Sequence, residues 1–216
     1  DWSESRGLGD VYKRQFYNET KDKGIKPTPT IGGVGLISDY QKMITMDFKN
    51  EGNLVYVIGK TEGHLDQSIF AREILYEKKG PPPTINLFNE KNIGETVLDL
   101  VQKNLIVSCH DVSLGGILTA VSKMCIKGNR GIKINILKGL TNKYEYFFGE
   151  DQARYIVEIP KSNLNTVNEI LNKYSVHFDE FGIVDAKSIK YKDDINLPIE
   201  ELADAHKYWL NKYMDS

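Results

Sequence analysis

The chain has 216 residues, of which 40% are hydrophobic, 27% charged and 10% aromatic, a composition typical of a soluble globular protein. Its net charge of -2 comes from acidic and basic residues that are interspersed, so no concentrated basic face is expected for nucleic acid or a membrane surface. No apolar run approaches the roughly 20 residues that cross a bilayer, and both cysteines lie in apolar stretches, which predicts reduced thiols in a cytoplasmic protein.

The N-terminal part of the chain shows no clear helix or strand pattern. Residues 1–15 are polar, contain glycine and have no periodicity, so they are left out of the fold prediction. Residues 31–37 form a glycine-rich apolar segment. The boundary of the main domain is predicted just after it, near Ser38–Gln41.

A strand and a helix are expected first after this boundary. Residues 53–59 are rich in Val, Tyr and Ile, which is typical of a buried strand. Residues 64–79 predict a helix, which the proline run after Gly80 is expected to end. Its apolar face is formed by Leu65, Ile69, Phe70 and Ile74.

Helices and strands alternate through the middle of the chain. Residues 95–104 predict an amphipathic helix and residues 105–111 a buried strand. Two glycines then open a helix that runs to Gly128. Residues 131–137 and 153–159 predict two further strands.

Two helices and a hairpin are expected in the last part of the chain. Ser162 is a candidate N-cap for a helix to residue 174, and residues 177–192 predict a short strand and a hairpin. Residues 197–214 predict a terminal helix. Its inward-facing residues are expected to be Leu202, Ala205, Trp209 and Leu210. Strands that alternate with helices of this length indicate an α/β (α+β) layered sandwich.

The first segment that can carry chemistry runs from a predicted strand into a predicted helix. Its polar residues are His110, Asp111 and Ser113, and Gly115 and Gly116 follow. Glycines allow close backbone approach, and the first turn of a helix favours anions such as phosphate. Asp111 is also the candidate magnesium ligand. On the pattern alone, a tight strand-to-helix turn with Asp111 or Ser113 as a cap is the favoured interpretation.

The second segment, Glu150, Asp151 and Gln152, lies directly before a predicted strand. These side chains present acceptors and a donor that can receive ribose hydroxyls or amide groups. The structural alternative is a polar turn with Arg154 as an exposed partner of a carboxylate. His64 and Asp66, at the start of the first predicted helix, are weaker candidates for ligands. Neither a Walker A sequence nor a GxGxxG fingerprint is present, and neither cysteine has a nucleophile's surroundings.

The order of these segments is more specific than any one of them. The blocks FYNET, PTPTIGGVGLI, GKTEGHLDQS, HDVSLGG and FGEDQARYIV follow one another from Phe16 onward. Over residues 16 to about 214 the chain resembles the second half of phosphoribosylformylglycinamidine synthase, a family in the aminoimidazole ribonucleotide synthase superfamily. The resemblance implies a mixed sheet flanked by helices. It also implies that residues 16–38 are the tail of the second ATP-handling domain and residues 39–216 the second copy of its partner domain.

The family reaction is implied by this resemblance only. ATP and Mg²⁺ activate the amide of formylglycinamide ribonucleotide, and ammonia from glutamine then gives the amidine. The catalytic histidine of the family lies in the first half, so no catalytic residue is expected in this chain. The partners expected are the remainder of the same chain, small-molecule substrates and, if this is the small form, a separate glutaminase subunit and a small adaptor subunit.

Some residues depart from the family pattern. Leu114 stands where aspartate is usual, Asp66 where glycine is usual, and a Gly-Asn-x-Ser segment before Tyr17 is missing. Two alternative functions therefore stay open. One is another ATP-using member of the superfamily, such as aminoimidazole ribonucleotide synthase, selenophosphate synthetase or thiamine-phosphate kinase. The other is a non-catalytic scaffold or docking domain.

Overall fold

The structure is a computed structural model that describes residues 19–20, 23–24, 32–37, 39–135 and 142–215. Its contacts divide the chain into two units between Ser38 and Asp39. In the first unit, strands β1 (Glu19–Thr20) and β2 (Lys23–Gly24) pair antiparallel. The segment 1–15 and the PTPT block lie outside the described residues, so the domain assignments made from the sequence for this unit stay predictions.

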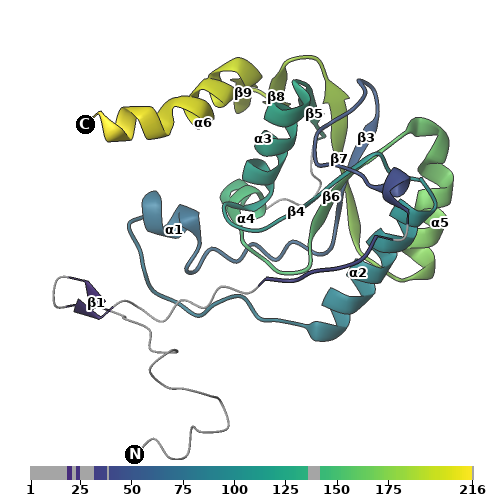
Figure 1. The fold of residues 1–216 in the computed structure, drawn as a ribbon, viewed down its shortest axis with the longest axis horizontal. Coiled ribbons are helices and arrows are strands. Elements are labelled where there is room, and N and C mark those ends of the chain that lie inside the picture. Colours follow the sequence, from purple (N-terminus) through teal and green to yellow (C-terminus); the bar gives the residue numbers. More distant parts are fainter. Residues whose placement is uncertain (1–18, 21–22, 25–31, 38, 136–141, 216) are drawn as a thin grey trace, which may run out of the picture. The chain divides into compact units, whose positions relative to one another are not determined.

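One seven-stranded mixed sheet forms the centre of the second unit, in the order β4-β6-β3-β7-β5-β8-β9 (Figure 1). Neighbouring strands are antiparallel except for β5 and β8, which are parallel. The strands are β3 (Leu54–Ile58), β4 (Ser108–Asp111), β5 (Gly131–Ile134), β6 (Tyr155–Ile159), β7 (Phe178–Asp185), β8 (Ser188–Tyr191) and β9 (Ile195–Pro198).

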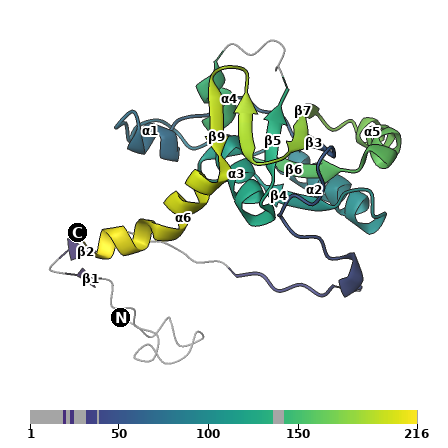
Figure 2. The same cartoon turned by 90° about the horizontal axis from the view of Figure 1, so that it is seen from above.

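Helices cover both faces of this sheet, so the predicted layered fold with a mixed sheet is confirmed (Figures 1 and 2). The α-helices are α1 (Ile69–Glu73), α2 (Leu87–Gln102), α3 (Gly116–Gly128), α4 (Lys143–Phe148), α5 (Leu164–Lys173) and α6 (Ile199–Met214). Short 3-10 helices η3 (Tyr40–Lys42) and η4 (Lys161–Asn163) precede β3 and α5. None of the helices among the described residues is long and apolar enough to span a membrane.

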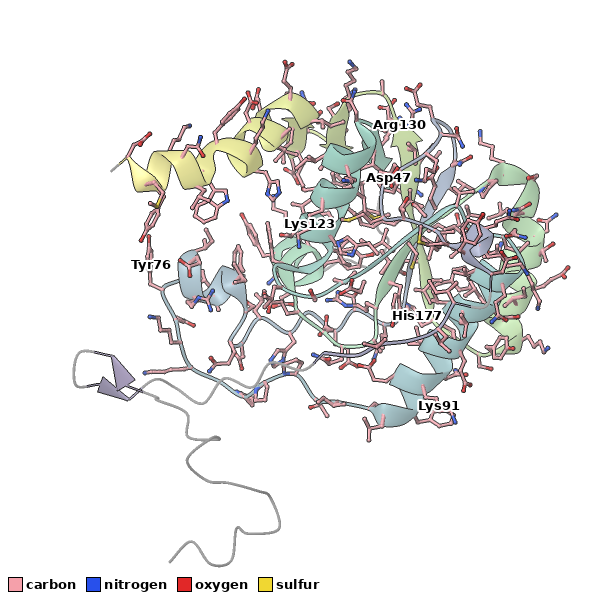
Figure 3. All side chains as sticks on the ribbon, viewed as in Figure 1. Asp47, Tyr76, Lys91, Lys123, Arg130 and His177 are labelled. Atoms are coloured by element: carbon pink, nitrogen blue, oxygen red, sulfur yellow. The ribbon has the colours of Figure 1, made fainter. Side chains whose placement is uncertain are left out.

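The central strand β3 explains why two hydrophobic cores form. Successive side chains of a strand point to opposite faces, and nearly every residue of β3 is apolar and buried. Val55 and Val57 join the core beneath α3, α4 and α6, whereas Tyr56 and Ile58 join the core beneath α2 and α5. Figure 3 shows side chains filling both spaces, while Lys91 on α2 points outward.

The strand predicted over residues 53–59 and the helix that follows the paired glycines are found at the expected places. The predicted 64–79 helix is too long, because α1 begins only after its N-cap Ser68 and ends at Glu73, well before the prolines. Helix α2 in turn begins earlier than predicted, with Asn86 as its N-cap. Asn163 rather than Ser162 stands at the N-cap of α5.

The predicted hairpin within residues 177–192 is wrong in its pairing. β7 and β8 are joined by two residues but do not pair, because β5 lies between them and pairs with both. Gly131 at the start of β5 makes this possible, since a Cβ there would lie 2.2 Å from the Ser188 carbonyl oxygen. The hairpin is formed instead by β8 and β9.

Candidate ligand-binding site

The two polar segments singled out in the sequence lie side by side in the structure. β4, which ends in Asp111, pairs antiparallel with β6, so that Asp111 is opposite Tyr155. A cavity of about 370 Å³ opens where the two segments meet. Of the eight residues predicted for binding, five line it: Asp111, Ser113, Glu150, Asp151 and Gln152.

A second cavity of about 660 Å³ adjoins the first. The two share Asp66, Pro83, Asp151, Gln152 and Ala153 as lining residues, so together they form one recessed region. The loop before α1 and the start of α2 complete the larger cavity, with His64 and Asn89 among its lining residues.

Asp151 holds the loop that forms one wall of this region. Its carboxylate accepts hydrogen bonds from the backbone N–H groups of Glu62 (3.1 Å), Gly63 (3.0 Å) and His64 (3.0 Å). Three consecutive N–H groups around one carboxylate form an anion-binding loop whose anion belongs to the protein itself. Of these three residues only His64 belongs to the predicted 64–79 helix, and α1 begins later, after its N-cap Ser68.

Glu150 joins two helix starts in the same way. One oxygen of its carboxylate accepts from the N–H groups of Ile69 and Gly115, each at 2.8 Å. Its own N–H donates to the carbonyl oxygen of His64 at 2.8 Å. The N-terminus of α3, where the sequence suggested an anion, therefore already holds a carboxylate. The ligand-binding roles of Glu150 and Asp151 stay predictions, and their contacts make them parts of the cavity wall.

Arg154 is buried, which corrects the expectation of an exposed ion-pair partner. Its guanidinium donates to the Gly149 carbonyl oxygen at 2.6 Å and the Thr61 hydroxyl at 3.3 Å, and lies 3.5 Å from the Asp151 carboxylate. Burial lowers the pKa of this guanidinium, and Asp151 opposes that effect. These contacts attach the 149–151 turn to Thr61 in the loop that follows β3. The buried Arg154 guanidinium therefore stabilises the wall of the cavity.

The residues of the first polar segment, from His110 to Gly116, differ in their exposure to solvent. Asp111 and Ser113 are exposed, whereas the His110 imidazole is largely buried and contacts the Asp111 carboxylate through Nδ1 at 3.0 Å. His110, Gly115 and Gly116 are not among the lining residues of either cavity.

The two glycines have a packing role. Gly115 (φ 84°) is the N-cap of α3, and Gly116 has φ 71°. A Cβ on Gly116 would lie 2.7 Å from the Phe147 carbonyl oxygen of α4, so glycine allows the two helices to approach.

The electrostatics of the smaller cavity are acidic. Asp66 and Glu90, which the sequence alone did not place there, face it together with Asp111. Glu90 lies in the first turn of α2, and no local motif indicates that it faces the same cavity as Asp111. A site of this charge suits hydroxyl, amine or metal-associated groups better than a bare phosphate. Among the described residues, however, no three His, Cys, Asp or Glu side chains are arranged to hold a metal ion.

Both cysteines are unpaired thiols with raised pKa values. Burial, with a smaller contribution from the Asp111 carboxylate, raises the pKa of Cys109 to about 12. Burial also raises the pKa of Cys125. A neutral buried thiol is a poor nucleophile, which agrees with the inert setting expected for both.

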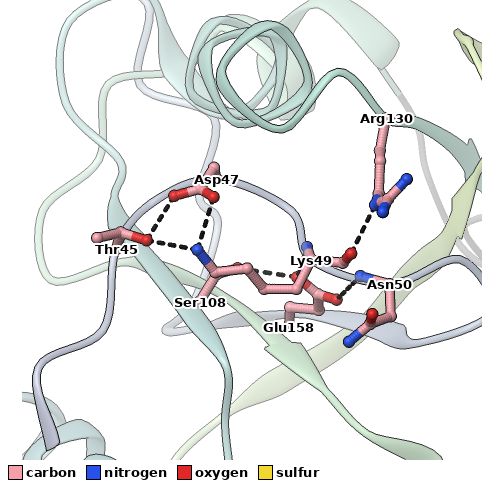
Figure 4. Close-up of polar contacts among 7 residues, drawn as sticks. All are labelled: Thr45, Asp47, Lys49, Asn50, Ser108, Arg130 and Glu158. Atoms are coloured by element: carbon pink, nitrogen blue, oxygen red, sulfur yellow. Dashed lines mark hydrogen bonds and ion pairs between the residues drawn. The ribbon is translucent and has the colours of Figure 1, made fainter. Parts of the chain in front are cut away.

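A further polar cluster, at the opposite end of the β4–β6 pair from the cavity, was not anticipated from the sequence (Figure 4). Glu158 of β6 is fully buried. Its carboxylate accepts from the N–H groups of Lys49 (2.7 Å) and Asn50 (3.0 Å), the Asn53 amide (2.7 Å) and the Ser108 hydroxyl (3.2 Å). A glutamate in an otherwise apolar strand was the only sequence signal for it.

Comparison with known proteins places this fold and site in a family. The model of the family described as AIR synthase related protein, C-terminal domain, matches residues 50–193, which include both polar segments. The chain belongs to this family. The expected membership of the aminoimidazole ribonucleotide synthase superfamily is thereby confirmed.

Two curated relatives of the chain are subunits of phosphoribosylformylglycinamidine synthase. Phosphoribosylformylglycinamidine synthase subunit PurL of Pelagibacter ubique is 59% identical over 201 residues, covering 93% of this chain and 28% of the relative. The same subunit of Rhodopseudomonas palustris strain TIE-1 is 38% identical over 199 residues, covering 92% of this chain and 27% of the relative. The resemblance predicted from the sequence is confirmed, and the chain spans less than a third of the length of these relatives.

Solved structures of Thermotoga maritima share the fold of this AIR synthase related domain. PurL complexed with FGAR has a TM-score of 0.64 at 21% identity, and the match covers 76% of this chain and 30% of that one. PurL complexed with ATP (TM-score 0.58, 20% identity) and PurLQS (0.57, 22%) each cover 76% of this chain and 28% of theirs. At these identities the likeness concerns the fold.

Proposed function

We propose that this chain is the C-terminal portion of a cytoplasmic phosphoribosylformylglycinamidine synthase. The parent enzyme would convert formylglycinamide ribonucleotide, glutamine-derived ammonia and ATP to formylglycinamidine ribonucleotide, ADP and phosphate. The observation that carries the proposal is the 59% identity to the PurL subunit of P. ubique across 93% of this chain. The same relationship supports a separate glutaminase subunit and a small adaptor subunit as partners, as does the shared fold with PurLQS of T. maritima.

Within the parent, we assign the domain a supporting role rather than a catalytic one. Glu150 and Asp151 are engaged by backbone N–H groups, and burial keeps both thiols protonated. Asp111, Ser113 and Gln152 remain exposed at the cavity and are the groups able to meet a ligand. Asp111 would be a single protein ligand for Mg²⁺ that arrives with nucleotide phosphates, since this ion commonly uses one or two carboxylates plus phosphates and water.

The ligase assignment is tested in a chimera. This chain replaces the aligned segment of the full-length P. ubique subunit, and ADP release is measured with ammonia and formylglycinamide ribonucleotide. We expect ADP release that depends on both substrates and lies within about tenfold of the parental rate, a difference of roughly 1.4 kcal/mol. A folded chimera that releases no substrate-dependent ADP would contradict the assignment.

The role of the cavity is tested by calorimetric titration of the 216-residue chain with Mg-ADP, Mg-ATP and formylglycinamide ribonucleotide. Nucleotide binding that weakens at least tenfold in Asp111→Ala, and not in the control Asp193→Ala in the turn between β8 and β9, would make the cavity a nucleotide site. Absence of binding by the folded chain would instead assign it a scaffold role. Nucleotide binding with the same affinity in Asp111→Ala as in the original chain would place the nucleotide outside this cavity.

A further inference from the structure

Helix α6 is only partly covered by the rest of its domain. Ile199 is buried and Leu202 packs against the core on the α3 side of the sheet. Beyond these first turns the helix runs away from the sheet, as two perpendicular views show (Figures 1 and 2). The sequence predicted that Ala205, Trp209 and Leu210 would face inward, and this is wrong, because all three are exposed.

Beyond His206, large apolar residues are exposed on the last turns of the helix, on the side that is buried at its start. Trp209 follows Leu202 by seven positions, which puts both on one face, and Leu210 and Met214 are four apart on the adjoining line. Trp209 is 57% exposed, Leu210 50% and Met214 73%. The Trp209 ring also lies 6.4 Å from the ring of Tyr213.

Single exposed apolar residues are common on protein surfaces, but a continuous group of large ones marks an interaction site. On this face the exposed His206 separates the buried start of the helix from the apolar group of the last turns, and two separate apolar groups on one helix are the pattern of a helix with two packing partners. The first partner is α3.

We propose that the last turns of α6, centred on Trp209, Leu210 and Met214, dock onto the part of the parent polypeptide that lies outside this chain. The P. ubique relative aligns with 93% of this chain and only 28% of its own length, so most of that polypeptide is available as the partner. This inference rests on the family relationship and does not depend on the proposed reaction.

The area of this apolar group favours this partner over a second copy of the chain. A stable association between separate molecules buries about 1,200–2,000 Å² in total, more than a few side chains on one helix provide. Within one polypeptide the partner is present at an effective concentration in the millimolar range, so a smaller apolar contact is sufficient.

The experiment compares the accessibility of one position in two settings. Leu210→Cys is introduced into the 216-residue chain and into the chimera with the P. ubique subunit, and maleimide labelling of the α6 peptide is followed by mass spectrometry. Asn172→Cys on α5, an exposed position on the opposite face of the sheet, is the matched control. Sedimentation of the isolated chain is measured at the same concentrations.

We expect Leu210→Cys to react readily in the isolated chain and at least tenfold more slowly in the chimera, while Asn172→Cys reacts equally in both. Equal labelling of Leu210→Cys in both settings would overturn the proposal. Protection already present in the isolated chain would also overturn it, and a dimer in sedimentation would then identify a second copy as the occupant. None of these readouts requires catalytic activity, so a failure here is distinct from a failure of the ligase assignment.

Discussion

Buried carboxylates explain much of the local structure at the residue scale. Removing an ionised group from water costs several kcal/mol unless hydrogen bonds replace its hydration. Glu158 meets this requirement with four donors, from Lys49, Asn50, Asn53 and Ser108. Its position on β6 thus joins the loop before β3 to β4. Glu158 therefore stabilises the folded state by holding residues 49–53 and β4 together.

Glu158→Gln is expected to lower the free energy of unfolding by about 2–4 kcal/mol, because an amide nitrogen would face donors that the carboxylate oxygen now accepts from. Urea unfolding followed by circular dichroism measures the change. Glu169→Gln on the exposed face of α5 is the control and should stay within about 0.5 kcal/mol of the original chain. A loss no larger than that of the control would show that the Glu158 contacts contribute little.

At the scale of elements, Glu150 determines how two helix starts meet. One of its carboxylate oxygens accepts hydrogen bonds from the N–H groups of Ile69, at the start of α1, and Gly115, at the start of α3. The charge also complements the positive end of the α3 dipole. The same contact attaches the segment before α1 to the turn before β6.

Glu150→Ala should release both helix starts, lower the free energy of unfolding by about 2–3 kcal/mol and speed amide exchange at residues 68–70 and 114–117. Exchange is measured by mass spectrometry on native protein. The neighbouring Gln152→Ala removes an exposed side chain from the same turn and should leave both quantities nearly unchanged. Unchanged exchange at both helix starts in Glu150→Ala would refute this role.

Some elements could be predicted from local pattern, and others depend on distant contacts. β3, β6 and α3 were found because apolar runs and paired glycines are local signals. The start of α1 was not predictable, because its first residue, Ile69, donates to the carboxylate of Glu150, which lies far along the chain.

Strand pairing and the burial of helix faces also depend on contacts between segments that are distant in the sequence. β7 and β8 read as a hairpin because the sequence does not show that β5 lies between them. The inward face predicted for α6 is wrong beyond Leu202, because periodicity shows which residues share a face but not what covers that face. The meeting of the two polar segments at one cavity likewise follows from the β4–β6 pairing and not from either segment alone.

At the scale of the whole molecule, both hydrophobic cores belong to the second unit. The core on the α3 side is built from residues between Phe48 and Leu202, and the core on the α2 side from residues between Ile44 and Phe178. Each core therefore lies within the unit that begins at Asp39. The second unit thus contains the contacts that a cooperative folding transition requires.

A chain shortened to residues 39–216 is accordingly expected to fold, with one cooperative thermal transition within about 3 °C of the full chain. Scanning calorimetry measures the transition, and the ratio of calorimetric to van't Hoff enthalpy tests whether it is two-state. Removal of residues 1–59 is the contrasting variant, because it also deletes β3, whose residues contact both cores, and it should abolish the transition. If the 39–216 chain failed to fold, the first unit would have to supply contacts that the second needs, and the boundary at Ser38 would not separate two independent folding units.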